Sequence, residues 1–146
     1  MRLTAKSEYG LIAMIDLACS FGSGPVSARE ISERREIPPR FLEQLFVALR
    51  RAGVVSAVRG AKGGFVLTRQ PDEISVLEIV EALEGPLETS VCDSERESGC
   101  TRSGACAAAP VWVKATRALR DVFATTSLAE LAGNQQVMDS RVGARG

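Results

Sequence analysis

The sequence predicts a mainly α-helical chain with one small β-hairpin. Three helical patterns occupy the first 53 residues, where apolar side chains recur at three- and four-residue spacing. Two short β-type runs follow, and a further amphipathic stretch of about 16 residues lies nearer the C-terminus. Three helices followed by a hairpin is the order of a winged helix-turn-helix, so we expect this domain followed by a long C-terminal helix.

The first three helices are predicted from their ends as well as their faces. A Phe-Gly-Ser-Gly-Pro run ends a first helix over residues 5–21. Ser27 and Glu30 form a capping box that opens a short second helix. Pro39 suits the first position of a third helix, and Gly53 suits the position just beyond its end.

The hairpin is predicted from VVSAV and GFVLT, which are joined by the glycine-rich tip RGAKGG at 59–64. A second capping box, Ser75 with Glu78, opens the helix ISVLEIVEALEG. The long amphipathic helix starts near Pro110, and a small final helix covers 127–133.

These signals divide the chain into four parts. We expect a winged helix-turn-helix over 1–86, a cysteine-bearing loop over 87–107, C-terminal helices over 108–133 and a flexible tail over 134–146. The formal net charge is zero, but the first 70 residues carry +5 and the rest carry −5. A basic first half suits a nucleic-acid partner.

No targeting or membrane segment is expected. Lys6, Glu8 and Asp16 interrupt the apolar N-terminal stretch, and no run approaches the ~18 apolar residues of a membrane helix. We therefore expect a cytoplasmic protein. Thiols stay reduced there, so clustered cysteines bind metal more often than they form disulfides.

Seven residues in the first half are candidates for DNA contacts. The N-terminal residues of a recognition helix face base edges in the major groove, where Arg, Glu and Gln can bond guanine, cytosine and adenine. A narrow minor groove attracts a wing-tip arginine, and other cations can contact phosphates. The candidates are Arg40, Glu43 and Gln44 for the major groove, Arg59 for the minor groove, and Arg50, Arg51 and Lys62 for phosphates. The alternative is that these side chains only solvate a helical face.

Three stretches carry a resemblance to a known family: MRLTAKSEYGLIAMIDLA, FLEQLFVALRRAGVVSAVRGAKGGFVL and ISVLEIVEALEGP. They are similar to the Rrf2 family of bacterial transcription regulators, and the similarity runs from residue 1 to about 133. The resemblance implies a homodimer on palindromic double-stranded DNA, paired through the long C-terminal helix as a dimerisation helix. It also implies that Arg40, Glu43 and Gln44 read the major groove and that Arg59 enters the minor groove.

Cys92, Cys100 and Cys106 lie in the polar loop with the spacing C-x7-C-x5-C, and the chain has no histidine. This spacing lacks the C-x2-C pair of common zinc sites, and thiolates are the usual ligands of iron–sulfur clusters. A zinc ion and free thiols are the alternatives. In iron–sulfur members of the family three cysteines lie at this place, so the resemblance implies an iron–sulfur cluster. A 2Fe–2S cluster is slightly favoured over 4Fe–4S, because two irons need only four terminal ligands.

The resemblance also bears on the fourth ligand. One branch of the family carries a histidine three residues after the last cysteine, but Ala109 stands there, which excludes that ligand. Other members use a carboxylate from the start of the first helix, supplied across the dimer, and Glu8 occupies that place. The alternative is that Glu8 is an ordinary first-turn acid stabilised by the helix dipole. Cys19, one turn after Ile15, is expected in the core.

The sequence indicates a regulator rather than an enzyme. A chain without histidine has no Ser/His/Asp set, and RGAKGG lies inside a hairpin instead of preceding a helix as a phosphate-binding loop does. We expect a transcriptional repressor whose DNA binding is controlled by a cluster that senses redox state, iron status or nitric oxide. The alternative is a cluster-free or zinc-bound regulator of the same fold that responds to a protein or small-molecule partner.

Overall fold

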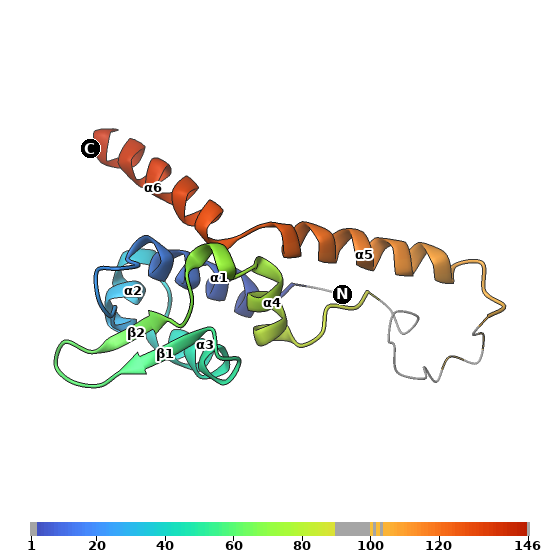
Figure 1. Ribbon diagram of the computed structural model, residues 1–146, viewed down its shortest axis with the longest axis horizontal. Coiled ribbons are helices and arrows are strands. Elements are labelled where there is room, and N and C mark those ends of the chain that lie inside the picture. Colours follow the sequence, from blue (N-terminus) through green and yellow to red (C-terminus); the bar gives the residue numbers. More distant parts are fainter. Residues whose placement is uncertain (1–2, 90–99, 101, 103, 146) are drawn as a thin grey trace.

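The computed structural model describes residues 3–89, 100, 102 and 104–145. The elements in chain order are α1 (Ala5–Cys19), α2 (Ala28–Arg35), α3 (Pro39–Arg51), β1 (Val55–Val58), β2 (Gly64–Leu67), the short 3-10 turn η1 (Pro71–Glu73), α4 (Val76–Glu84), α5 (Ala109–Thr125) and α6 (Leu128–Arg145). Helices α1 to α4 pack with the hairpin, whereas α5 and α6 extend from this unit in different directions (Figure 1). The predicted mainly α-helical fold with one hairpin is confirmed. None of the described helices is long and apolar enough to cross a membrane.

Both predicted capping boxes form and set where their helices begin. Ser27 Oγ accepts the Glu30 N–H at 3.1 Å, and the Glu30 carboxylate accepts the Ser27 N–H at 2.8 Å. The hydrogen bonds with Ser27 hold the pKa of Glu30 below its ordinary value. Ser75 and Glu78 repeat the arrangement at the start of α4. Pro39 is the first residue of α3, where its missing N–H is not needed.

The hairpin is held against the linker between α1 and α2. Its strands pair antiparallel, with Val55 opposite Leu67. Val26 in the linker exchanges two backbone hydrogen bonds with Phe65, at 3.1 and 2.8 Å. A Cβ on the neighbouring Gly64 would come within 2.4 Å of the Val26 carbonyl oxygen, so this approach requires glycine. The linker therefore fixes the hairpin to the helix-turn-helix.

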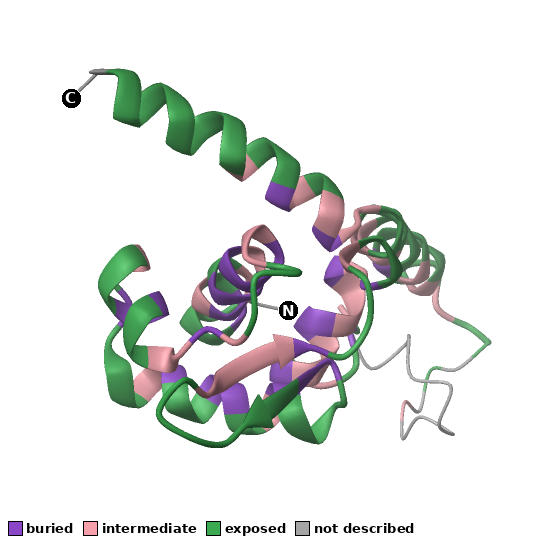
Figure 2. Ribbon diagram, turned by 60° about the vertical axis from the view of Figure 1, so that its left-hand side comes forward, coloured by how far each residue is buried: buried purple, intermediate pink, exposed green. Residues whose placement is uncertain are grey.

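Burial is concentrated in the compact unit, and most of α5 and α6 is exposed (Figure 2). A main apolar cluster draws on α1 to α4, the hairpin and the start of α6. A smaller cluster joins α4 and the chain just after it to the two C-terminal helices; it contains Val76, Val80 and Leu87, with Leu119, Phe123 and Leu131 packed against them. The only residue of α5 that is buried is Thr116. The C-terminal helices therefore join the core at their meeting point and not along their lengths.

The last helix is longer than the sequence predicted. We expected a short helix over 127–133 and a frayed tail, but α6 runs from Leu128 to Arg145. Side chains one turn apart support the extension, because Gln135 Nε2 donates to Asp139 at 2.8 Å. Asp139 also pairs with Arg35 of α2 at 3.0 Å. This contact joins residues 104 positions apart, which local sequence patterns do not reveal.

We predict that Gly10→Ala destabilises the fold, because Gly10 lets α1 approach α4. An added Cβ would lie 2.2 Å from Leu83 Cδ1, and Leu83 is itself buried. The free energy of unfolding should fall by about 1–3 kcal/mol, although alanine is the better helix former. The control is Gly133→Ala in α6, where the methyl group meets nothing within 4 Å and up to about 1 kcal/mol should be gained. Urea unfolding measures both; a Gly10→Ala variant as stable as the unmodified chain would contradict the close approach.

Candidate functional site

The exposed face of α3 carries the three residues predicted to read bases. Arg40, Glu43 and Gln44 are all exposed. The opposite face of the helix is buried through Leu42, Leu45, Phe46 and Leu49. Val47 also lies on the outer face and is 55% exposed, although the sequence analysis did not single it out. Its spacing of three and four residues from Gln44 and Glu43 was the available signal, and an apolar side chain there can contact a thymine methyl group.

Unpaired positive charge lies at both ends of α3 and on the hairpin tip. The exposed cations Arg40, Arg50, Arg51, Arg59 and Lys62 make no ion pair with any described residue. Four other arginines of the first half are each paired with a carboxylate: Arg29, Arg34, Arg35 and Arg69. These arginines and Lys62 thus form a paired set and an available set, and all seven predicted DNA contacts lie on α3 or at the hairpin tip beyond it.

A ring stack ties the hairpin to α3. The rings of Phe46 and Phe65 lie 4.0 Å apart between centroids and are nearly parallel, with 3° between their planes. Phe46 belongs to the buried face of α3, and Phe65 lies on β2. The recognition helix and the wing are therefore packed as one unit, so that Arg59 at the tip keeps a defined place relative to the outer face of α3.

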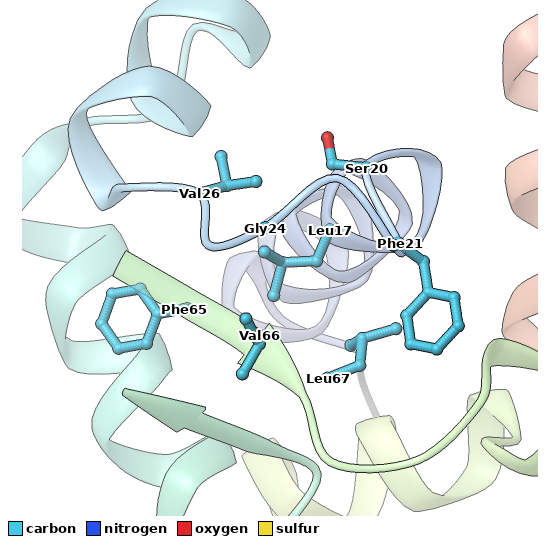
Figure 3. A pocket seen from close by; sticks show the side chains of 9 residues that line it. Leu17, Ser20, Phe21, Gly24, Val26, Phe65, Val66 and Leu67 are labelled. Carbon is cyan, nitrogen blue, oxygen red and sulfur yellow. The ribbon is translucent and has the colours of Figure 1, made fainter. Parts of the chain in front are cut away.

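An apolar pocket of about 220 Å³ lies behind the hairpin (Figure 3). It opens between the end of α1, the following linker and strand β2. The side chains that line it are apolar apart from Ser20, and include Leu17, Phe21, Val26, Phe65 and Leu67. No motif in the sequence pointed to it.

The structure describes part of the chain between Cys92 and Cys106, called here the cysteine segment. Cys92 lies outside the described residues, whereas Cys100 and Cys106 are half-buried free thiols. The described residues contain no group of three or more Cys, Asp or Glu side chains placed to hold a metal. Cys100 and Cys106 form no disulfide and can both act as thiolate ligands, so these two donors fit an iron–sulfur cluster or zinc.

Both ends of the cysteine segment are fixed to α5. Before it, the Thr89 N–H donates to Thr116 Oγ1 at 3.2 Å, and Thr89 Oγ1 donates to the Trp112 carbonyl at 3.3 Å. After it, the Ala109 N–H donates to the Cys106 carbonyl at 3.3 Å. The segment therefore starts and finishes on the first half of α5, beside the uncovered part of that helix.

The start of α1 is tied to the end of α4 by Glu84, which the sequence analysis missed. Its Oε1 accepts from the Thr4 N–H at 3.2 Å, from Ser7 Oγ at 2.8 Å and from the Thr4 hydroxyl. Burial works to raise the pKa of Glu84, but these hydrogen bonds outweigh it and hold the pKa below its ordinary value. Glu8, the predicted fourth ligand, is exposed on the same turn of α1, and within the described protomer it forms no three-ligand group with Cys100 and Cys106.

Cys19 lies where the sequence predicted, packed against the main core. Its Sγ donates a weak hydrogen bond to the Ala132 carbonyl at 3.6 Å. Burial raises the pKa of this thiol. A protonated thiol beneath α6 is a packing residue and a poor metal ligand.

Helix α5 carries apolar side chains that the described chain covers only in part. Leu119 and Phe123, in its second half, pack on the smaller cluster. Val111 and Val122, eleven residues apart and so on one face, are each 59% exposed, and Trp112 in the first turn is 45% exposed. A stripe of this kind on a long helix is typical of a helix that pairs with another chain.

Comparison with known proteins covers most of the chain. The Rrf2 profile, described as an iron-dependent transcriptional regulator, matches residues 3–134. The transcriptional regulator IscR of Xenorhabdus nematophila is 37% identical over 139 residues, which cover 95% of this chain and 84% of that protein. IscR of Escherichia coli is also 37% identical over 139 residues, covering 95% of this chain and 85% of its own.

Two solved structures have the same fold. T. potens IscR superposes with a TM-score of 0.75 at 36% identity and covers 92% of this chain and 88% of its own. CymR, the global cysteine regulator of B. subtilis, superposes with a TM-score of 0.75 at 35% identity and covers 92% of this chain and 98% of its own. The recognition helix, the wing and the matched profile agree: the chain belongs to the Rrf2 family of winged-helix transcriptional regulators, which are not enzymes.

Proposed function

We propose that the protein is a homodimeric transcriptional repressor that binds a palindromic operator and is controlled by an iron–sulfur cluster. The observation that carries the DNA-binding part is the set of unpaired cations on α3 and the hairpin tip, beside the exposed base-reading face. Two such units related by a two-fold axis would read two half-sites.

On DNA, α3 lies in the major groove with Arg40, Glu43 and Gln44 toward the base edges. Arg59 at the tip of the wing enters the neighbouring minor groove, and three cations contact phosphates: Arg50, Arg51 and Lys62. The Phe46–Phe65 stack sets the distance between the two groove contacts. The uncovered stripe of α5 supports pairing with the same helix of a second copy, because neither Val111 nor Val122 has a covering partner in the described chain.

The cysteines Cys92, Cys100 and Cys106 would hold the cluster, with Glu8 of the partner protomer as fourth ligand. A bound cluster supplies iron that responds to oxidants, nitric oxide and iron supply. The chain's own residues supply the link to DNA: Glu84 fixes the start of α1, which bears Glu8, to the end of α4, from which the cysteine segment follows. A change in the cysteine segment would therefore act on α1 of the DNA-binding unit.

A second candidate is a regulator of the same fold without a cluster, which responds to a small molecule or a protein. CymR superposes as well as IscR does, with the same TM-score of 0.75. The apolar pocket behind the wing offers a place for a small ligand. Iron, acid-labile sulfide and zinc per protomer, measured on protein purified without oxygen, separate the two: iron equal to sulfide supports the cluster, and their absence supports this second candidate.

We predict that Arg59→Ala weakens specific DNA binding by about tenfold, because a minor-groove guanidinium is lost. Preference for A·T pairs at the wing position should relax as well. Arg117→Ala is the matched control: it removes an exposed arginine from α5, away from α3 and the wing, and should leave both unchanged. Fluorescence anisotropy and footprinting on an operator selected by the protein measure these effects. An unchanged footprint for Arg59→Ala would remove the wing from DNA recognition.

Cys106→Ala is expected to lose iron and sulfide together while the protein stays a folded dimer, because the segment lies outside the main core. Cys19→Ala should keep its metal, since Cys19 packs beneath α6. Metal analysis and size-exclusion chromatography with light scattering measure the two properties. If Cys106→Ala releases zinc without sulfide, or dissociates the dimer, the site is a structural metal centre instead.

For Glu8→Ala we expect an unchanged iron content but a shifted visible spectrum and faster loss of the cluster in air, because a weak oxygen ligand is replaced by solvent. Glu130→Ala, another exposed acid but on α6, serves as control and should match the unmodified protein. Identical spectra and decay rates for all three proteins would show that Glu8 is not a ligand.

A further inference from the structure

A four-residue ionic network joins three helices that are distant in sequence. Its centre is Asp16 of α1, whose side chain is 1% exposed. Arg34 of α2 donates to both Asp16 oxygens, at 3.0 and 2.7 Å, and Arg35 donates to one of them at 2.7 Å. Arg35 also donates to both oxygens of Asp139 on α6, at 3.3 and 3.0 Å. Two carboxylates and two guanidinium groups make the network neutral.

The contact between Arg35 and Asp139 attaches the outer half of α6 to α2. Leu128 and Ala132 bury the first turns of this helix, but no residue from Gly133 to Ala144 is buried. Among the described residues, the outer half reaches the helix-turn-helix by hydrogen bonds or ion pairs only through Asp139 and Arg35. The hydrogen bond to Asp139 raises the pKa of Arg35, and Arg35 in turn holds the pKa of Asp139 below its ordinary value. Both groups are therefore charged at neutral pH.

Arg35 lies at the turn between α2 and α3, which sets the direction of the recognition helix α3. It is the last residue of α2, and the next residue, Glu36, adopts the left-handed conformation with φ of 54°. The Ile37 N–H then donates to the Ser32 carbonyl at 3.1 Å, and Ser32 Oγ donates to the Ile37 carbonyl at 2.6 Å. Helix α3 begins two residues later. The side chain of Arg35 is 15% exposed, so it is enclosed between α1, α2 and α6.

We propose that Asp139 is a positioning residue for DNA binding: through Arg35 it fixes the turn between α2 and α3, and so makes α6 part of the DNA-binding unit. Asp139 does not touch DNA in this arrangement. The inference rests on the DNA-binding function proposed above and is independent of the cluster. Through Asp139, helix α6 would then contribute to the affinity of the protein for its operator sequence.

Removing the charge of Asp139 makes the proposal testable. A purely electrostatic effect and a loss of positioning would change the affinity for the operator in opposite directions. Asp139→Asn removes one negative charge, which by simple electrostatics strengthens binding to any DNA. Loss of positioning instead weakens binding to the preferred sequence, by about fivefold if roughly 1 kcal/mol is lost. Glu130→Gln is the control, because it removes the same charge from an exposed position of α6 that makes no described ion pair. Asp139→Glu keeps the charge and should restore binding to within about twofold.

The experiment uses full-length protein, an operator selected from a random duplex library and an unrelated duplex, with anisotropy at fixed salt. We expect Asp139→Asn alone to lose operator affinity while its affinity for the unrelated duplex stays equal or rises. Amide hydrogen exchange at Ile37 in the free protein should also become faster. Operator binding by Asp139→Asn that equals Glu130→Gln, or unchanged exchange at Ile37, would overturn the proposal. Failure of the unmodified protein to select any sequence would overturn the DNA-binding function, and the exchange at Ile37 would then decide the role of Asp139 in the turn.

Discussion

The buried carboxylate of Asp16 constrains the arrangement of the DNA-binding half. A charge with 1% of its side chain exposed is costly unless it is paired, and both Asp16 oxygens are paired with arginines from the last turn of α2. Those arginines therefore point toward α1. The consequence is a fixed angle between α1 and α2, and from it a fixed direction for the turn into α3.

Helix α1 has a different connection at each end. Near its C-terminal end Asp16 holds α2, and Cys19 lies against the backbone of α6. At its N-terminal end Thr4 and Ser7 are bound by Glu84, the last residue of α4. The middle of α1 is packed in the core. A structural change in the cysteine segment would thus act on the first turn of α1, and it would reach the helix-turn-helix through the last turn of α1.

The elements were predictable where their signals are local. Ser27 and Glu30, three residues apart, fix the start of α2, and Pro39 fixes that of α3, since capping and backbone geometry act within one turn. The exposed face of α3 followed from periodicity in the same way. The length of α6 and the role of Glu84 were missed because their contacts join residues 104 and 77 positions apart. Pairings at such distances depend on the assembled fold and leave no periodic trace in the sequence.

The strength of these connections limits what regulation can achieve. A ligand shifts an equilibrium only by the difference in its free energy of binding to two states, and couplings between sites are typically about 1–3 kcal/mol. The hydrogen bonds of Glu84 are on this scale, at about 1 kcal/mol each. The core contacts of Met14 and Leu17, in the middle and later part of α1, cost more to disturb. A switch built on these connections would therefore act by making or breaking polar contacts at the ends of α1 and at Arg35, and would leave the apolar core packed.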